Sequence, residues 1–358
     1  MVSFPIYAFF VHLVSVVTLS TIWVFRDKRT PIIISFLLSI IVISFLTSLF
    51  DLSDYGIYAL IFEQIDPDLP FFDSLALTPF EIGYFALNYF SRLFLDNFDA
   101  IRIGLIFIIL MIKAFFLVRW GKFYFISFVF YLSFVWYPDS YLLRSSVAAS
   151  IALFGFWALL GNRPRYQFFV PIIIASTFHV SALILIPFWW LKDVKVYKKQ
   201  GFVLLTSIIV LGIFGIGHLI VNVIAGVLSV DISLVDTLIT YGESKYGESA
   251  GILRVSVILY VLVAFVYIYF RDILVRRIHG YDLILCILLF SLFLLLGLSD
   301  FLVLSDRLFR LTGFFFAIAI GQIFYCVRKK EQMLCVALAV MFCNVFPYFQ
   351  PGAIPFRY

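Results

Sequence analysis

Long apolar runs, separated by short polar segments, follow one another along almost the whole chain. A helix needs about 20 apolar residues to cross the hydrocarbon core of a bilayer, and several runs reach that length, beginning with 6–25 and 31–50. Hydrophobic residues make up 64% of the 358 residues and charged residues only 13%, whereas soluble domains carry roughly 25% charged residues. The sequence therefore predicts one all-α, polytopic integral membrane domain over residues 1–358.

The charges in the loops predict which side each loop faces, because short loops rich in lysine and arginine stay in the cytoplasm. The basic segments assigned to the cytoplasmic face are 26–29, 119–122, 163–165, 192–199, 271–280 and 328–330. The mainly acidic segments 51–80 and 229–250 are assigned to outer loops, the first of which extends to residue 100. This pattern predicts about ten spans, with both termini outside.

Within the first outer loop, Glu81–Leu95 is expected to be an amphipathic helix that lies on or dips into the outer surface. Its apolar residues recur at helical spacing and are Ile82, Phe85, Tyr89 and Leu93, while its polar residues on other faces are Glu81, Asn88 and Arg92. Only one crossing fits between the acidic loop and the basic turn at 119–122, and the run 101–118 supplies it. A full span with reassigned neighbours is the alternative.

The run Tyr166–Leu191 lies between two basic loops, so it should cross the membrane an even number of times. Two short helices that meet near His179 would satisfy this condition, with the chain breaking at Phe178–Ser181. Irregular backbone at membrane depth is tolerated where it lines a protein cavity, so such a break would place His179 in a cavity. A plain span with lysines on the outer side is the alternative.

Ionisable groups inside or at the mouth of membrane runs are candidates for function, because burying them in hydrocarbon is costly. Arg144 opens the run 142–160, and His179 lies in the middle of the next run. Arg307 and Arg310 share a helix face beside Asp306. Since a guanidinium binds phosphate oxygens bidentately, these arginines indicate an anion site. A histidine that only hydrogen-bonds a neighbouring helix is the alternative for His179.

Other polar or polarisable residues are expected to have structural roles. Arg92 and Arg102, at the membrane edge, would extend toward the headgroups, and His218 lies in a glycine-rich run typical of close helix packing. Packing is also expected for the four cysteines, which are Cys286, Cys326, Cys335 and Cys343. The sequence shows neither clustered metal-ligand spacing nor a nucleotide-binding glycine loop, so no cofactor or metal is expected.

Four short patterns lie between residues 54 and 314. They are Asp54-Tyr55-Gly56-Ile57-Tyr58, Glu81-Ile82-Gly83-Tyr84, Leu143-Arg144-Ser145-Ser146-Val147-Ala148 with Ala175-Ser176-Thr177-Phe178-His179-Val180-Ser181-Ala182 after a basic turn, and Arg307 through Phe314. Together they resemble the EpsG-type branch of the Wzy polysaccharide polymerases. The family's own motifs usually read Glu-Pro-Gly-Tyr, Arg-Gln-x-Leu-Ala and Phe-His-x-Ser-Ala. Ser145 stands where the family usually has glutamine, and the arginine and Val-Gly-Thr common before the loop aspartate are missing ahead of Asp54.

The resemblance implies a GT-C-like polymerase or ligase architecture and glycosyl transfer at the outer face of a bacterial inner membrane. A growing O-antigen or exopolysaccharide chain would leave undecaprenyl diphosphate and join the terminal sugar of a new lipid-linked repeat. Its partners would be these lipid-linked donor and acceptor glycans, the bilayer, a chain-length regulator and a flippase, with no nucleic acid. The implied site residues are Glu81 or His179 as base, Arg144, Arg307 and Arg310 for the diphosphate, and Asp54, Tyr58, Tyr84 and Asp306 for the substrate.

Three other functions fit a polytopic protein with buried basic groups. A lipid-linked oligosaccharide flippase would also hold such groups in a cavity, although internal repeats or paired broken helices would be typical. An O-antigen ligase would use the same lipid donor, usually with a larger outer loop than 229–250. A membrane O-acyltransferase would use a histidine and an arginine near its first helix, where this chain has only His12.

Overall fold

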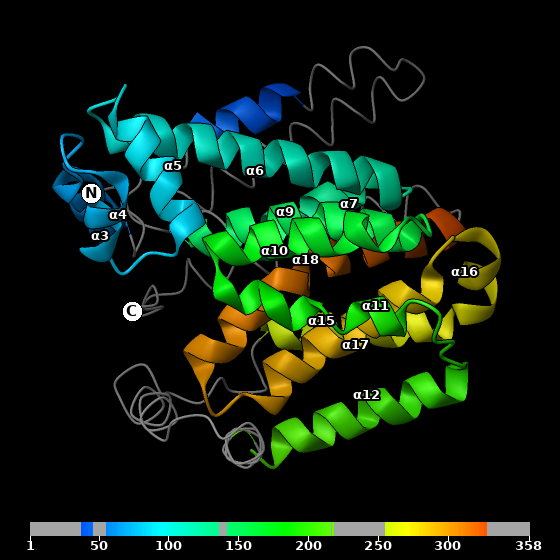
Figure 1. Cartoon of the computed structure of the whole chain (residues 1–358). Helices are drawn as coiled ribbons and strands as arrows, with labels where there is room; N and C mark the ends of the chain where they lie inside the picture. Colours follow the sequence, from blue (N-terminus) through cyan, green and yellow to red (C-terminus); the bar gives the residue numbers. More distant parts are fainter. Residues whose placement is uncertain (1–36, 46–54, 136–141, 216, 218–254, 328–358) are drawn as a thin grey trace, which may run out of the picture.

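The computed structural model describes residues 37–45, 55–135, 142–215, 217 and 255–327 (Figure 1). These residues form helices and short connections, and the described ranges contain no β-strand. A helical segment at 37–45 comes first. The helices between it and the first long span are α3 (Tyr55–Gln64), α4 (Phe71–Ala76) and α5 (Ile82–Arg92). The central helices are α6 (Phe98–Trp120), α7 (Tyr124–Phe130) with the π-helix η1 (Tyr131–Val135), α9 (Leu143–Leu160), α10 (Arg165–Phe178), the 3₁₀-helix η2 (Val180–Leu185) and α11 (Phe188–Leu191). The last helices are α12 (Lys198–Ile213), α15 (Val255–Tyr269), α16 (Arg271–Arg277), α17 (Tyr281–Gly297) and α18 (Leu302–Val327).

Three described helices are long and apolar enough to cross a membrane, namely α6, α9 and α18. The pair α15 and α16 forms a fourth candidate that is bent by 76° between its two helices. The expected spans 101–118, 142–160 and 308–327 are thus present, whereas the full number of about ten is not reached within the described ranges. The expected spans 6–25 and 333–346 lie outside those ranges.

The basic loops of the described chain meet at one end of the bundle. Arg271 Nε donates to the Val196 carbonyl oxygen at 2.6 Å, and Asp282 Oδ1 accepts from Val196 N at 3.2 Å, so the loop before α12 contacts the junction of α15 and α16. His279, in the connection to α17, lies with Nε2 2.8 Å from the Leu160 carbonyl oxygen at the end of α9. Of the segments expected on the cytoplasmic face, the described loops 192–199 and 271–280 therefore lie on one side of the molecule, beside the end of α9.

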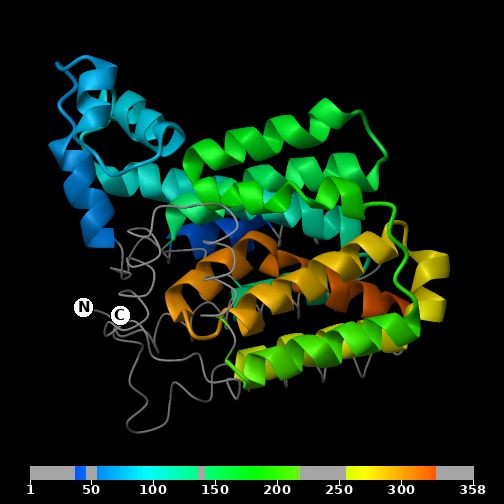
Figure 2. The same ribbon diagram turned by 60° about the horizontal axis from the view of Figure 1, so that its bottom comes forward.

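The run Tyr166–Leu191 turns back on itself, as the loop charges predicted. Helix α10 ends at Phe178, and η2 and α11 return beside it (Figures 1 and 2). Trp189 of the returning arm contacts both ends of the hairpin, with its ring 5.9 Å from the Arg165 guanidinium and 4.0 Å from the Lys192 ammonium. The chain thus enters and leaves this segment on the same side, and a plain span is excluded.

Helix α5 is separate from the spans, in keeping with the expected outer helix. Its eleven residues extend about 16 Å at 1.5 Å per residue, too short to cross a bilayer. The expected apolar face is confirmed at Phe85 and Tyr89, which are buried. It is wrong at its two ends, because Ile82 and Leu93 are each 46% exposed, and Asn88 is buried and donates to the Tyr84 carbonyl oxygen. The buried face of α5 is thus rotated from the one that the apolar spacing indicated.

Two basic residues of α6 are buried inside the bundle rather than extended to its edge. The Arg102 side chain is 2% exposed and its guanidinium lies 4.7 Å from the Tyr55 ring, so the expected extension toward headgroups is wrong for Arg102. Lys113 is 0% exposed, with its ammonium 5.3 Å from the Tyr131 ring and 5.9 Å from the Phe314 ring. Aromatic faces attract cations electrostatically, which offsets part of the cost of burying them.

The expected packing role of the cysteines is confirmed where the structure describes them. Cys286 on α17 and Cys326 on α18 are partly buried against the main hydrophobic core. Cys335, Cys343 and His218 lie outside the described residues.

Candidate functional site

Glu81 joins two residues from distant parts of the chain. Its Oε2 accepts from Arg144 Nη1 at 2.7 Å, and its Oε1 lies 3.0 Å from His179 Nδ1. The three side chains are 14–24% exposed, so the cluster is partly shielded and still open to solvent. The structure therefore brings together the Arg144 and His179 that the sequence analysis paired, with Glu81 between them.

Local backbone structure accounts for each position. Glu81 is the extended residue before α5, and Arg144 is the second residue of α9. His179 ends α10 with φ −158° and ψ 112°, an extended conformation that breaks the helix. The site thus forms where two helices begin and a third one ends.

Gly83 allows α5 to approach the end of α10 closely. A Cβ atom on Gly83 would lie 2.8 Å from the Thr177 carbonyl oxygen and 2.9 Å from its carbonyl carbon. Real Cβ atoms do not approach backbone so closely, so any larger residue would separate the two helices. Because Thr177 is two residues before His179, this contact also sets the distance between His179 and Glu81.

The charge state of Glu81 follows from its surroundings. Burial by itself raises the pKa of this carboxyl, but the hydrogen bond with His179 and the positive charge of Arg144 outweigh burial and lower the pKa from 4.5 to about 2. Glu81 is therefore ionised at neutral pH. A carboxylate with so low a pKa is a weak proton acceptor.

This ionised carboxylate also determines how His179 is protonated. An ionised carboxylate only accepts hydrogen bonds, so the His179 Nδ1 that faces it carries a proton. In the neutral ring, Nε2 is then the nitrogen that can accept a proton. The same arrangement of carboxylate and imidazole positions the general base in serine hydrolases.

Aromatic rings surround the Arg144 guanidinium. Its central carbon lies 5.0 Å from the Phe80 ring and 6.0 Å from the Tyr58 ring. Tyr84 packs against both rings, at 5.0 and 5.6 Å between centroids, and is fully buried, which raises the pKa of its hydroxyl. No hydrogen-bond partner is found within the described residues for the buried Arg144 Nε. The guanidinium thus keeps donor capacity beyond its bond to Glu81.

The predicted second group of arginines lies on α18. The buried Arg310 forms an ion pair with Asp306, and Arg307 is partly exposed. Phe156 of α9 meets Phe315 of α18 at 4.9 Å between ring centroids, and the two helices begin at the same end of the bundle (Figures 1 and 2). At 1.5 Å per residue, Arg310 is then about 10 Å deeper along the bundle than Arg144.

The remaining predicted site residues have different outcomes. Tyr58 and Tyr84 belong to the aromatic surroundings of Arg144, and their contact with substrate stays a prediction, as does that of Asp306. Asp54 lies outside the described residues. Within the described ranges, no three histidine, cysteine or acidic side chains gather as a metal site would require.

Two residues of the site have roles that were not identified from the sequence, although Gly83 belongs to one of the quoted patterns. Phe80 precedes Glu81 directly and contacts Arg144, and Gly83 lies against Thr177. Gly83, two residues after the candidate acid Glu81, could have indicated a close contact with another backbone segment, because glycine is favoured where backbones approach closely. The partner of that approach could not be named without the fold.

The chain was compared with known protein families, curated proteins and solved structures. No curated protein and no solved structure matches the chain. The model of the EpsG family matches residues 50–350, a range that includes Glu81, Arg144, His179 and all of α18. The chain belongs to the EpsG family.

Proposed function

We propose that this protein is a membrane glycan polymerase that transfers a growing undecaprenyl-diphosphate-linked glycan onto a lipid-linked repeat unit. Membership of the EpsG family supports a polymerase-like role. The observation that carries the proposal is the bridge from Glu81 to Arg144 and His179. Through this bridge, the Arg144 guanidinium, which can bind a diphosphate, and the His179 ring, which can accept a proton, contact the same carboxylate.

The reaction in this proposal is a displacement at the anomeric carbon of the donor. The acceptor sugar's hydroxyl oxygen forms a bond to that carbon, while the bond from the carbon to the diphosphate oxygen breaks. The hydroxyl proton passes to His179 Nε2, and undecaprenyl diphosphate leaves with the bonding electron pair. Arg144 stabilises the negative charge that develops on the leaving oxygen, an effect that often supplies the largest part of catalysis.

Glu81 orients the other two groups in this mechanism. Its low pKa makes it a poor base, whereas its two hydrogen bonds fix the His179 ring and the Arg144 fork. His179 is therefore the proposed base, and Glu81 is a positioning residue. The sequence left both residues open as the base, and the low pKa of Glu81 supports the choice of His179.

The other site residues take supporting roles. Arg307 and Arg310 are proposed to hold the second phosphate of a diphosphate or the acceptor's lipid diphosphate, deeper along α18. Asp54, Tyr58, Tyr84 and Asp306 are proposed to shape the sugar site. The rings of Tyr58 and Tyr84 are buried, so these two tyrosines would act by packing beside Phe80 and Arg144. The site is proposed to face the periplasm across a bacterial inner membrane, next to a flippase and a chain-length regulator.

Purified protein in lipid vesicles, supplied with one lipid-linked repeat unit and no other enzyme, tests the proposal. A polymerase yields a ladder of longer glycans and releases one undecaprenyl diphosphate for each new bond, and Glu81→Gln abolishes the ladder. Transport of the lipid-linked glycan without elongation would instead identify a flippase. Transfer that requires a lipid A-type acceptor would identify a ligase, and a requirement for an acyl donor would identify an O-acyltransferase.

A further inference from the structure

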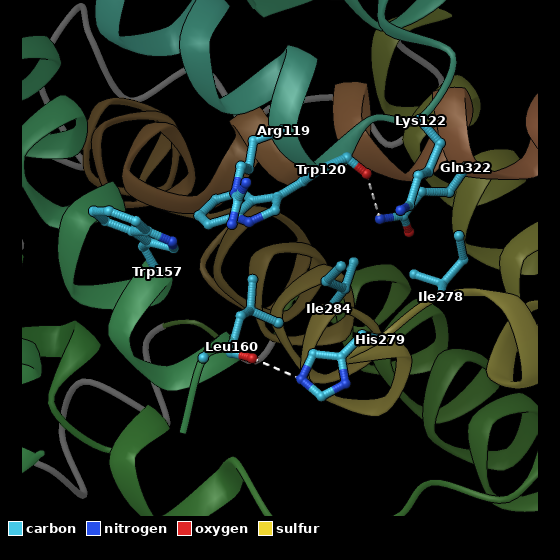
Figure 3. A pocket seen from close by; sticks show the side chains of 10 residues that line it. Arg119, Trp120, Lys122, Trp157, Leu160, Ile278, His279, Ile284 and Gln322 are labelled. Carbon is cyan, nitrogen blue, oxygen red and sulfur yellow. Dashed lines mark hydrogen bonds between the residues drawn. The ribbon is translucent and has the colours of Figure 1, made fainter. Parts of the chain in front are cut away.

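A cavity of about 410 Å³ opens at the end of the bundle opposite the Glu81 cluster. Figure 3 shows the side chains that line it. It lies where α6, α9 and α18 finish and where the connection from α16 to α17 passes. Helix α9 carries Arg144 at its start and contributes Leu160 to the cavity, and these residues are about 24 Å apart along the helix axis. The proposed glycosyl transfer therefore does not use this cavity.

The cavity is lined by basic side chains and by no carboxylate. Arg119, Lys122 and His279 belong to its lining, and Arg163 lies beside it with its guanidinium 4.0 Å from the Trp157 ring. In the described part of the chain, Arg119 and Lys122 take part in no ion pair. Uncompensated cations around a concave surface attract anions, because the cavity concentrates their field.

Tight packing fixes the turn that carries Lys122. A Cβ atom on Gly121 would lie 2.6 Å from the Leu117 carbonyl oxygen, and one on Gly321 would lie 2.5 Å from the Gly121 carbonyl oxygen. Helix α18 therefore contacts the turn backbone directly. Lys122 itself has a φ of +58°, which is uncommon for a residue other than glycine and is often retained at functional positions.

Hydrogen bonds hold other lining groups in place. The Gln322 amide donates to the Trp120 carbonyl oxygen at 2.8 Å, while its oxygen accepts from the Tyr267 hydroxyl at 2.6 Å. His279 Nε2 donates to the Leu160 carbonyl oxygen, which leaves Nδ1 as the second polar atom of the ring. Figure 3 shows the Trp157 and Gln322 side chains on opposite sides of the cavity, with Arg119 and Trp120 between them. Hydrogen bonds thus fix Gln322 and the His279 ring in the wall of the cavity, whereas the Arg119 and Lys122 side chains are exposed.

We propose that this cavity binds the phosphate group of an anionic phospholipid from the cytoplasmic leaflet. Arginine and lysine bind phosphate oxygens through charge-assisted hydrogen bonds, and tryptophan is favoured at the headgroup level of a bilayer. Basic pockets between membrane helices on the cytoplasmic side are suited to anionic headgroups. The apolar residues of the lining, including Leu160 and Ile284, accommodate the glycerol and upper acyl carbons.

Thermal unfolding of the full chain in a neutral detergent tests this site with phosphatidylglycerol as the probe. Phosphatidylglycerol should raise the Tm, since a ligand that binds the folded state stabilises it, and phosphatidylcholine at the same concentration should not. The double variant Arg119→Gln/Lys122→Gln should lose most of the shift. Arg276→Gln, which removes an exposed cation of α16 outside the cavity, should keep it.

Each outcome bears on the proposal. Equal Tm shifts from the two lipids, or equal losses in the double variant and in Arg276→Gln, would overturn it. A shift by inorganic phosphate that matches phosphatidylglycerol and disappears in the double variant would keep the phosphate site and assign its ligand to solution rather than to lipid. Should the double variant not fold, native mass spectrometry of phosphatidylglycerol retained by Lys122→Gln replaces it, and undiminished retention overturns the proposal.

Discussion

Glu81 Oε2 lies 2.7 Å from Arg144 Nη1, although the two residues are 63 positions apart in the sequence. The contact connects the start of α5, outside the spans, with the second residue of α9, a membrane span. The other oxygen of the same carboxylate meets His179 at the break of the α10 hairpin. One carboxylate thus determines the relative positions of the proposed phosphate-binding and proton-accepting groups.

Arg144→Lys should reduce polymerisation by about 100-fold or more while leaving the protein folded. Lysine keeps the charge, but its single ammonium cannot bond Glu81 and a diphosphate through a planar fork, and losing one such donor typically costs about 100- to 1,000-fold in rate. Glycan length and turnover by the purified variant are the measurements. Arg92→Lys, which changes an arginine paired with the exposed Asp96, is the matched control and should stay near the wild-type rate. Polymer of normal length from Arg144→Lys would refute the role of Arg144.

Gly83→Ala should lower turnover by about 10-fold or more, because an added methyl group meets the Thr177 carbonyl and moves α5 away from His179. Misplacing a reacting group by about 1 Å can cost roughly 100-fold in rate. Gly56→Ala on α3 is the matched control, since a Cβ atom there has no neighbour within 4 Å. Turnover and the Tm should both fall for Gly83→Ala and stay unchanged for Gly56→Ala. Equal behaviour of the two variants would show that the close approach at Gly83 has no function.

The lowered pKa of Glu81 predicts a specific dependence of stability on pH. Because the folded pKa of about 2 is below the reference value of 4.5, the ionised carboxylate stabilises the folded state fully above about pH 4.5. This contribution is lost progressively as the pH falls toward 2. The Tm difference between wild type and Glu81→Gln should therefore be constant from pH 7 to 5 and shrink at pH 3. A difference that vanishes by pH 5 would contradict the ion pair.

The hairpin 165–191 predicts that both of its ends lie on the cytoplasmic side of the membrane and that its tip near His179 is reached from the outside. In a variant without native cysteines, Arg163→Cys and Lys195→Cys should react only with a reagent that reaches the cytoplasm. Val180→Cys, at an exposed position next to His179, should react with an impermeant reagent from outside. Labelling of Lys195→Cys from outside would contradict the assignment of both arms to the cytoplasmic side.

The sequence predicted those features that depend on charge and chain order. Loop charges favoured an even number of crossings between Arg165 and Lys192 over a plain span, and Trp189 contacts both residues in the structure. The cost of burying ions in a membrane identified Arg144 and His179. The structure brings these two residues together around Glu81, whereas their roles in a reaction stay predictions. Charge bias and burial cost act on single residues and loops, which is why a single sequence can show them.

Features set by tertiary contacts could not be predicted in this way. Asn88 is buried in the same packed face as Phe85 and Tyr89, where its amide donates to the Tyr84 carbonyl oxygen. Arg102 and Lys113 are buried against rings from other helices, such as those of Tyr55 and Tyr131. A single sequence does not show which rings from other helices will surround a cation. The burial of Arg102, which was expected at the membrane edge, and of Lys113, inside the expected span 101–118, could therefore not be predicted.

The most direct test of the account is the single-turnover rate of His179→Gln on a lipid-linked repeat, measured together with binding of the lipid-linked donor. If His179 Nε2 accepts the proton, the rate should fall by about 100-fold or more, as removal of a general base typically causes. Donor binding should stay unchanged, because Arg144 is still present. His12→Gln, which replaces a histidine of the first apolar run, should keep the wild-type rate. A His179→Gln protein that elongates glycans at the wild-type rate would contradict the account, because the amide can replace a packing hydrogen bond but cannot act as a base.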